Sequence, residues 1–179
     1  MLRGRAKGVL LVAVLVVCAP VAYAAYKFSR PPFALSVFVH RKGEAGAGRQ
    51  IVLGNPWVRP GDELRLRVTV PRAGYLAVVA IGGRSGMETG VYYPRGPVAA
   101  QIEAGDAIEL AQIVEADNRV GNEHVYGLLC KDPIKIDDIV AALSGPGNAS
   151  AYMAPHGGLD FPCDIATVAF PKCEPDECP

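Results

Sequence analysis

The chain has 179 residues, and its 18 basic side chains balance 18 acidic ones, so its formal net charge is zero. Its 20 glycines and 15 prolines punctuate short apolar runs, which favours short strands and turns over long helices. No run of Lys and Arg is longer than Arg41-Lys42, so we expect no nucleic-acid partner.

The first 24 residues have the layout of a signal peptide. Basic residues at positions 3, 5 and 7 precede an unbroken apolar run over residues 9–19. Pro20 ends any helix there, and Ala22 and Ala24 supply small residues at the two positions that a signal peptidase must accept. We therefore predict cleavage after Ala24, a short extended linker over residues 25–32, and export to the periplasm or outer cell envelope.

Two other fates of this segment are alternatives to cleavage. Residues 8–28 are long enough to cross a hydrocarbon core of roughly 30 Å at about 1.5 Å per residue, which would anchor the chain in the inner membrane. Residues 15–18 resemble a lipoprotein processing site. However, Val17 precedes Cys18 where such a site needs Gly, Ala or Ser, so lipidation of Cys18 is disfavoured.

The exported part differs from the whole chain in charge and in cysteine count. Without residues 1–24 it has 15 basic and 18 acidic side chains, a formal net charge of −3. Its length of about 155 residues suits one domain, placed at residues 33–171, with a Cys-containing tail at 172–179. An even number of cysteines in an exported chain predicts disulfides, and we expect Cys130 to pair with Cys163 and Cys173 with Cys178. The cysteine spacing does not suit zinc, so we expect no metal and no cofactor.

The first strands follow from β-branched and alternating residues. Residues 33–40 predict a strand, followed by a loop over residues 41–50. Residues 63–70 alternate throughout, which predicts a sheet with one face on the core and the other in water. The apolar face carries Leu64, Leu66, Val68 and Val70, and the polar face carries Arg65, Arg67 and Thr69. We expect residues 75–81, a more buried strand, to form a hairpin with residues 63–70.

The remaining elements are short. Glycine-rich residues 82–86 predict a hairpin tip before a strand at 89–94, and further strands are expected at 99–102, 107–113, 125–130 and 164–170. Residues 115–123 and 145–158 have the composition of loops. One helix is predicted at 134–143, where apolar residues recur at helical spacing behind Asp132-Pro133. Seven or eight short strands and one short helix predict a mainly β fold, an antiparallel β-sandwich that is immunoglobulin-like or similar.

Candidate functional residues are few. His40, His124 and His156 stand beside no recognisable nucleophile motif, so we expect no catalytic residue. A small envelope hydrolase that uses His124 or His156 is the alternative. Trp57, Tyr92 and Tyr93 form a candidate binding surface, because aromatic side chains with polar tips are enriched at interfaces. Alternation along the strand would point one of the two tyrosines inward.

Three sequence segments resemble an uncharacterised bacterial envelope family, domain of unknown function 4384. These are the run from Trp57 to Val68, which contains Pro60-Gly61-Asp62, then residues 74–78, and the strand end at residues 91–94. The resemblance covers roughly residues 53–130 and is weaker onward to residue 170. It implies a β-sandwich accessory or sensory module and transfers no catalytic residue.

The function expected from these observations is an exported, non-enzymatic module. It would serve as an accessory, sensory or protein-binding domain of the bacterial cell envelope, with another envelope protein or a surface ligand as its partner. A purely structural envelope component is a further alternative.

Overall fold

The computed structural model describes residues 31–41, 48–52, 55–82, 88–144, 161–174 and 178. The predicted signal peptide with Cys18, most of the linker, the loop at 145–158 and His156 lie outside the described residues. The fold below belongs to the unit that spans Pro32–Pro179. Within the described ranges, no helix is both long enough and apolar enough to span a membrane.

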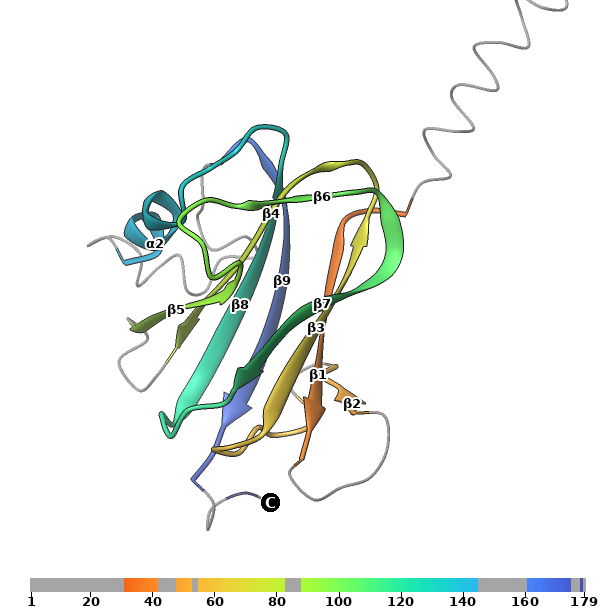
Figure 1. Ribbon diagram of the computed structural model, residues 1–179. Coiled ribbons are helices and arrows are strands. Elements are labelled where there is room, and N and C mark those ends of the chain that lie inside the picture. The colour runs from red at the N-terminus through yellow and green to blue at the C-terminus, as the bar shows by residue number, and fades with distance from the viewer. Residues whose placement is uncertain are drawn as a thin grey trace, which may run out of the picture. The chain divides into compact units, whose positions relative to one another are not determined.

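The described residues form two antiparallel sheets that face each other, with one helix outside them (Figure 1). The first sheet has the order β2-β1-β3-β7 and consists of β1 (Ala34–His40), β2 (Arg49–Gln50), β3 (Glu63–Val70) and β7 (Gly105–Glu115). The second has the order β5-β4-β8-β9, with β6 also paired to β4. Its strands are β4 (Gly74–Gly82), β5 (Glu88–Tyr93), β6 (Ala100–Ile102), β8 (Gly121–Cys130) and β9 (Cys163–Lys172). The predicted mainly β sandwich with one short helix is confirmed.

The two sheets differ in how many of their faces are covered. A core between the sheets takes alternate residues of β3, such as Leu64 and Leu66, together with Leu76 and Val78 of β4. A second core forms where α2 (Ile136–Ser144) packs on the other face of the second sheet, against Ala77, Val79, Tyr126 and Leu128. The central strands β4 and β8 of the second sheet are therefore buried on both faces, whereas β3 of the first sheet has one half-exposed face.

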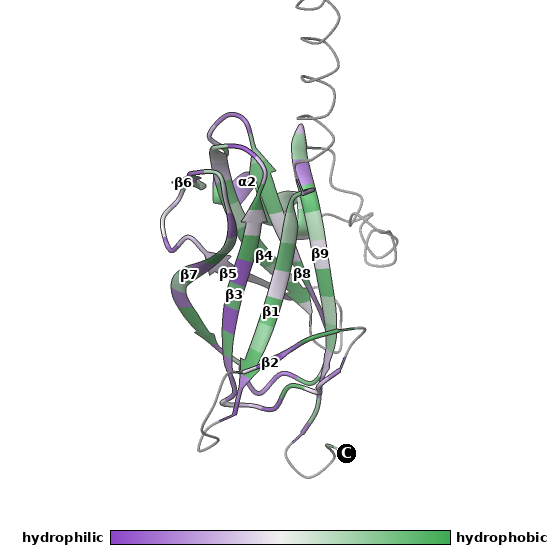
Figure 2. Cartoon of the chain, turned by 90° about the vertical axis from the view of Figure 1, so that its right-hand side faces the viewer, coloured by the Kyte–Doolittle hydropathy of each residue, from purple (hydrophilic) through white to green (hydrophobic). Residues whose placement is uncertain are grey.

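Hydrophobic pattern and burial agree in β3 and β4. β3 alternates buried and half-buried residues over its whole length, as the sequence predicts, and Figure 2 shows the corresponding hydrophilic and hydrophobic bands. β4 is almost continuously apolar, because a central strand covered on both faces has no side that meets water. Helix α2 begins and ends within two residues of the predicted 134–143, with Asp137 and Asp138 in its first turn.

The predicted hairpin between residues 63–70 and 75–81 is wrong. β3 pairs with β1 and β7, whereas β4 pairs with β5, β6 and β8, so the turn between β3 and β4 passes from one sheet to the other. Their patterns explain this separation, since a strand with a half-exposed face and a strand buried on both faces suit different sheets. The link between β6 and β7 also crosses between the sheets.

Two predicted loops contain strands. Arg49 and Gln50, at the end of the predicted loop 41–50, form β2 against β1. The predicted loop 115–123 is wrong at both ends, because Glu115 closes β7 and Gly121–Glu123 open β8. These segments look polar because they belong to strand ends and sheet edges. With them, the described residues hold nine strands, more than the seven or eight expected.

The turn before β3 has the geometry that its sequence predicts. Arg59-Pro60-Gly61-Asp62 is a type II turn, in which Asp62 N–H donates to Arg59 C=O at 3.1 Å and Gly61 has a φ of +82°. The buried Asp62 carboxylate accepts a hydrogen bond from Arg59 N–H at 2.9 Å. Ala116 N–H donates to Asp62 C=O and Gly61 N–H donates to Ala116 C=O, both at 2.8 Å, which fixes the chain just after β7.

Both predicted disulfides are present. Cys130 and Cys163 lie directly opposite each other on β8 and β9, so their bridge joins two paired strands. The sequence placed Cys163 before the last strand, whereas it is that strand's first residue. Cys173 pairs with Cys178 just beyond β9, which extends to Lys172, one residue into the predicted tail.

Candidate functional site

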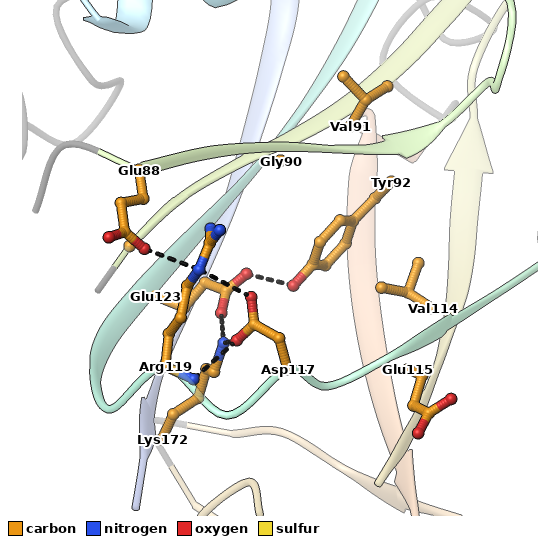
Figure 3. Close-up of a pocket in the computed structure, with 11 residues that line it drawn as sticks. Glu88, Gly90, Val91, Tyr92, Val114, Glu115, Asp117, Arg119, Glu123 and Lys172 are labelled. Atoms are coloured by element: carbon orange, nitrogen blue, oxygen red, sulfur yellow. Dashed lines mark hydrogen bonds and ion pairs between the residues drawn. The ribbon is translucent and has the colours of Figure 1, made fainter. Parts of the chain in front are cut away.

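A pocket of about 140 Å³ opens between the edge strands of the two sheets. β5 forms one wall with Glu88, Gly90, Val91 and Tyr92, and the end of β7 contributes Val114 and Glu115. Asp117 and Arg119 lie in the link between β7 and β8, while Glu123 and Lys172 come from β8 and β9 (Figure 3). The pocket therefore gathers residues from both sheets.

A buried ion pair lies at the base of this group. Glu123 and Lys172 are only 7% and 6% exposed, and Lys172 Nζ lies 2.8 Å from Glu123 Oε2. The hydroxyl of Tyr92, which is also buried, donates a hydrogen bond to the other carboxylate oxygen of Glu123. Lys172 also donates a hydrogen bond to Asp117. Each of these buried polar groups therefore has an oppositely charged partner or a hydrogen-bond partner, which offsets the cost of removing it from water.

An exposed ion-pair chain continues from Asp117 toward the rim. Arg119 Nε lies 2.9 Å from Glu88 Oε2 and 3.5 Å from Asp117 Oδ2. Arg119 N–H also donates to Asp117 Oδ1 at 3.1 Å. All three side chains are about half exposed, so this part of the network contributes much less to stability than the buried pair.

Strand alternation explains why the buried pair forms. Glu123 faces the same side of β8 as Val125 and Leu129, which belong to the core between the sheets. Phe170 lies opposite Glu123, and Lys172 follows two residues later on the same face of β9. Glu123 and Lys172 are therefore neighbours at the open end of the core, 49 residues apart in sequence.

The environment shifts the pKa of two groups in the network. Burial, and then the negative charge of Glu123, which also accepts the phenol's hydrogen bond, raise the pKa of Tyr92 far above its ordinary value. Burial alone would raise the pKa of Asp117. The hydrogen bonds from Lys172 and Arg119, with the positive charges of these residues, outweigh it and hold that pKa below its ordinary value.

The lining chemistry suits recognition of a charged group. Three carboxylates, those of Glu88, Asp117 and Glu123, lie around two cations, while the side chain of Glu115, which also belongs to the lining, points away from them (Figure 3). The lining therefore has an excess of negative charge. The lining contains no Ser, Thr, Cys or His side chain that could act as a nucleophile or as an imidazole base. Burial and the neighbouring Glu123 raise the pKa of the Tyr92 phenol and so favour its neutral form. Among the described residues, those of the pocket included, no group of three or more His, Cys, Asp or Glu side chains is placed to hold a metal ion.

The sequence-predicted site residues are dispersed. Tyr92 is the inward member of the tyrosine pair and lies in the pocket, whereas Tyr93 is partly buried against the core between the sheets. Trp57 is 40% exposed and belongs to neither described pocket. The predicted binding surface of Trp57, Tyr92 and Tyr93 is therefore not brought together around one described pocket.

The hydrolase alternative depends on two histidines. His124 lies within β8 and pairs with Ile81 of β4. It is half-buried, and burial lowers its pKa. The hydrolase alternative named His124 together with His156, which lies outside the described residues.

Sequence reasoning missed Glu123, Lys172, Asp117 and Arg119. One signal was available for Glu123, since it precedes Val125 and Leu129 at even spacing and so shares their face. Lys172 continues the alternation of Val168 and Phe170 in the same way. Nothing local indicates that these two charges face each other, because their pairing depends on the β8–β9 register.

Comparisons with protein-family models, with curated proteins and with solved structures find no match to this chain.

Proposed function

We propose that the chain is a non-enzymatic β-sandwich module, exported to the bacterial cell envelope, that binds a protein partner. The N-terminal sequence supports export, and the two disulfides suit an oxidising compartment. The resemblance to domain of unknown function 4384 agrees with an accessory or sensory role and belongs to the same proposal.

The observation that carries the proposal is an edge strand beside an acid-lined pocket. β5 is the last strand of its sheet in the described part of the chain, so its outer backbone edge is open to pairing with an extended segment. Val91 on this strand is 40% exposed. The pocket volume of about 140 Å³ is below the several hundred Å³ usual for small-molecule sites and suits a single side chain.

The negative charge of the pocket lining indicates which kind of partner segment would bind there. Glu115 lies at the end of β7, where its side chain points away from the ion pairs (Figure 3) and adds a carboxylate to the lining. A Lys or Arg side chain of the partner would offset that negative charge. The partner is thus an extended segment that adds to β5 and places a basic side chain in the pocket.

A capture experiment with matched variants tests this function. The full chain, made with its N-terminal segment in a bacterial host, is used to capture proteins from a solubilised envelope fraction. We expect a discrete partner whose recovery falls at least tenfold for Val91→Lys and for Glu115→Lys. Val98→Lys is the control, because Val98 is 41% exposed and lies outside the pocket lining.

Two results would overturn the proposal. One is the absence of any specifically captured envelope protein with the unsubstituted chain. The other is a captured partner whose recovery is the same for Val91→Lys, Glu115→Lys and Val98→Lys. Circular dichroism of each variant establishes that a loss of capture does not come from unfolding.

A further inference from the structure

A second hollow, of about 330 Å³, lies on the outer face of the first sheet. Phe38 and His40 of β1, Arg65 and Arg67 of β3 and Glu109 of β7 contribute to its lining. The residues that alternate with them along the strands, such as Val37 and Leu64, face the core, so the hollow belongs to the opposite side of the sheet. It shares no lining residue with the pocket between the edge strands.

The two arginines in this hollow have unused hydrogen-bonding capacity. Their nearest carboxylate oxygens lie beyond hydrogen-bond length, with Arg65 3.6 Å from Glu109 and 3.8 Å from Glu63, and Arg67 3.8 Å from Glu109. Neither side chain donates a hydrogen bond to any described residue, and the Nε atoms of both are buried and unpartnered. Among the described residues, two planar guanidinium forks therefore share one surface without a close oxygen acceptor.

Their neighbours position these arginines. The Arg67 guanidinium carbon lies 4.6 Å from the centre of the Phe38 ring, a cation–π contact that restrains the side chain across the strand pair. Phe38 itself lies opposite Arg65 in the β1–β3 register. On the wall of the hollow, Gly48 lies close to the His40 ring, and a Cβ there would come within 2.4 Å of that ring. The arrangement restrains both donors and leaves room beside them.

We propose that this hollow binds the carboxylate of a small ligand, with Arg65 and Arg67 as its donors. A guanidinium fork matches the geometry of a carboxylate. Arg65 and Arg67 are the cations of the lining and Glu109 is its carboxylate, while Glu63, which is not part of the lining, lies 3.8 Å from Arg65. The volume lies in the range of small-ligand sites, so the group that carries the carboxylate fits beside it.

Titration calorimetry on the full chain tests the proposal with defined probes. Glucuronate and N-acetylglutamate amide both present a carboxylate, one on a sugar and one on a peptide-like unit. Glucose and N-acetylglutamine amide are their uncharged counterparts. We expect at least one of the acids to bind at least tenfold more tightly than its counterpart, and the tighter acid identifies the sugar or the peptide as the source of the carboxylate.

Arginine substitutions connect that binding to the hollow. Arg65→Gln and Arg67→Gln should each weaken binding of the acid at least tenfold, and Arg67→Lys should weaken it less, because it keeps the charge and loses the fork. Arg72→Gln is the matched control, since Arg72 is equally exposed and pairs with Asp164 away from this face. In nuclear magnetic resonance spectra, the Nε–H signals of Arg65 and Arg67 should shift with the acid and not with the uncharged probe.

Three results would overturn the proposal. Neither acid binds more tightly than its uncharged counterpart, or the Arg65→Gln and Arg67→Gln variants bind as tightly as the unsubstituted chain, or Arg72→Gln weakens binding as much as they do. Because these residues lie outside the pocket between the edge strands, loss of carboxylate binding is separable from loss of partner capture.

Discussion

Lys172 lies in a nearly water-free position, where two carboxylates face it. Glu123 is equally buried, while Asp117 is about half exposed and can be rehydrated if its partner is lost. Removal of the lysine would therefore leave Glu123 as a buried charge with only the Tyr92 hydroxyl to stabilise it. Loss of Lys172 should therefore lower the free energy of unfolding more than loss of the exposed Arg119.

Lys172→Met should lower the free energy of unfolding by about 3–5 kcal/mol, the usual cost of leaving one member of a buried ion pair unpartnered. Arg119→Met is the surface control, and it should cost about 0–1 kcal/mol because its ion pairs are solvent-exposed. Urea denaturation of both variants at neutral pH measures the difference. Equal losses for the two variants would contradict the assignment of Lys172 as the buried partner.

We predict that the buried phenol of Tyr92 makes a pH-dependent contribution to the free energy of unfolding. In the unfolded chain a tyrosine ionises near pH 10, whereas burial and then Glu123 raise the pKa of folded Tyr92 well above that. Above about pH 10 the unfolded state releases a proton that the folded state retains, so the stabilisation is complete below pH 10 and declines as the pH rises.

Tyr92→Phe removes this dependence. The variant should be less stable than the unsubstituted chain by about 1.5–3 kcal/mol at pH 8, the value of a hydrogen bond to a charged group. Above pH 10 the difference should shrink by up to about 1.4 kcal/mol per pH unit. Denaturation curves at pH 8 and between pH 10 and 11.5 measure it, and a difference that stays constant over this range would contradict the prediction.

At the scale of elements, the two disulfides constrain loops of very different length. Cys130 and Cys163 are 33 residues apart and join the paired strands β8 and β9, whereas Cys173 and Cys178 are 5 residues apart and join positions beyond β9. In a chain-entropy description, stabilisation grows with the length of the closed loop, which gives about 4 kcal/mol for the first bridge and about 2 kcal/mol for the second.

The double variant Cys130→Ala/Cys163→Ala should therefore lose more stability than Cys173→Ala/Cys178→Ala. Guanidinium denaturation under non-reducing conditions measures both, and the two midpoints can be compared with that of the fully reduced chain. A larger loss from the short loop would show that the Cys173–Cys178 bridge restrains more of the fold than the segment it closes.

The sequence predicts most elements well because local patterns determine them. The alternation of β3, the apolar run of β4 and the helical spacing of Ile136, Ile139 and Leu143 each depend only on neighbouring residues. Both disulfides follow from cysteine count and spacing. The helix and these strands therefore lie within a few residues of their predicted positions.

Strand pairing is harder to predict from the sequence, because it depends on contacts between residues that are far apart in the chain. The sequence of the turn after Val70 is compatible with a hairpin and with a crossing between sheets. The crossing follows only once both faces of β4 are known to be covered. For the same reason, the sequence alone does not predict that Glu123 and Lys172 lie together. Gly121, Asn122 and Glu123 look like a polar loop until β9 pairs with them and brings Lys172 beside Glu123.

On the scale of the whole molecule, the sandwich is asymmetric. The second sheet has cores on both faces, between the sheets and under α2, and its central strands β4 and β8 each have strand partners on both sides. Arg65 and Arg67, the half-exposed arginines of the hollow that we propose binds a carboxylate, lie on the outer face of the first sheet. Both proposed binding regions thus lie away from the doubly covered centre, at an edge and on a half-exposed face.

This asymmetry predicts the order in which backbone amides exchange with solvent. Amides of β4 and β8 should exchange slowest and report an opening free energy close to that of global unfolding, because their exposure requires both cores to separate. Amides of β5 and β7, which are edge strands, should exchange through smaller local openings. Hydrogen exchange followed by nuclear magnetic resonance measures both sets on the same sample. If β7 were protected as strongly as β8, the first sheet would have a second covering layer, and the carboxylate hollow on its outer face would not be accessible to a ligand.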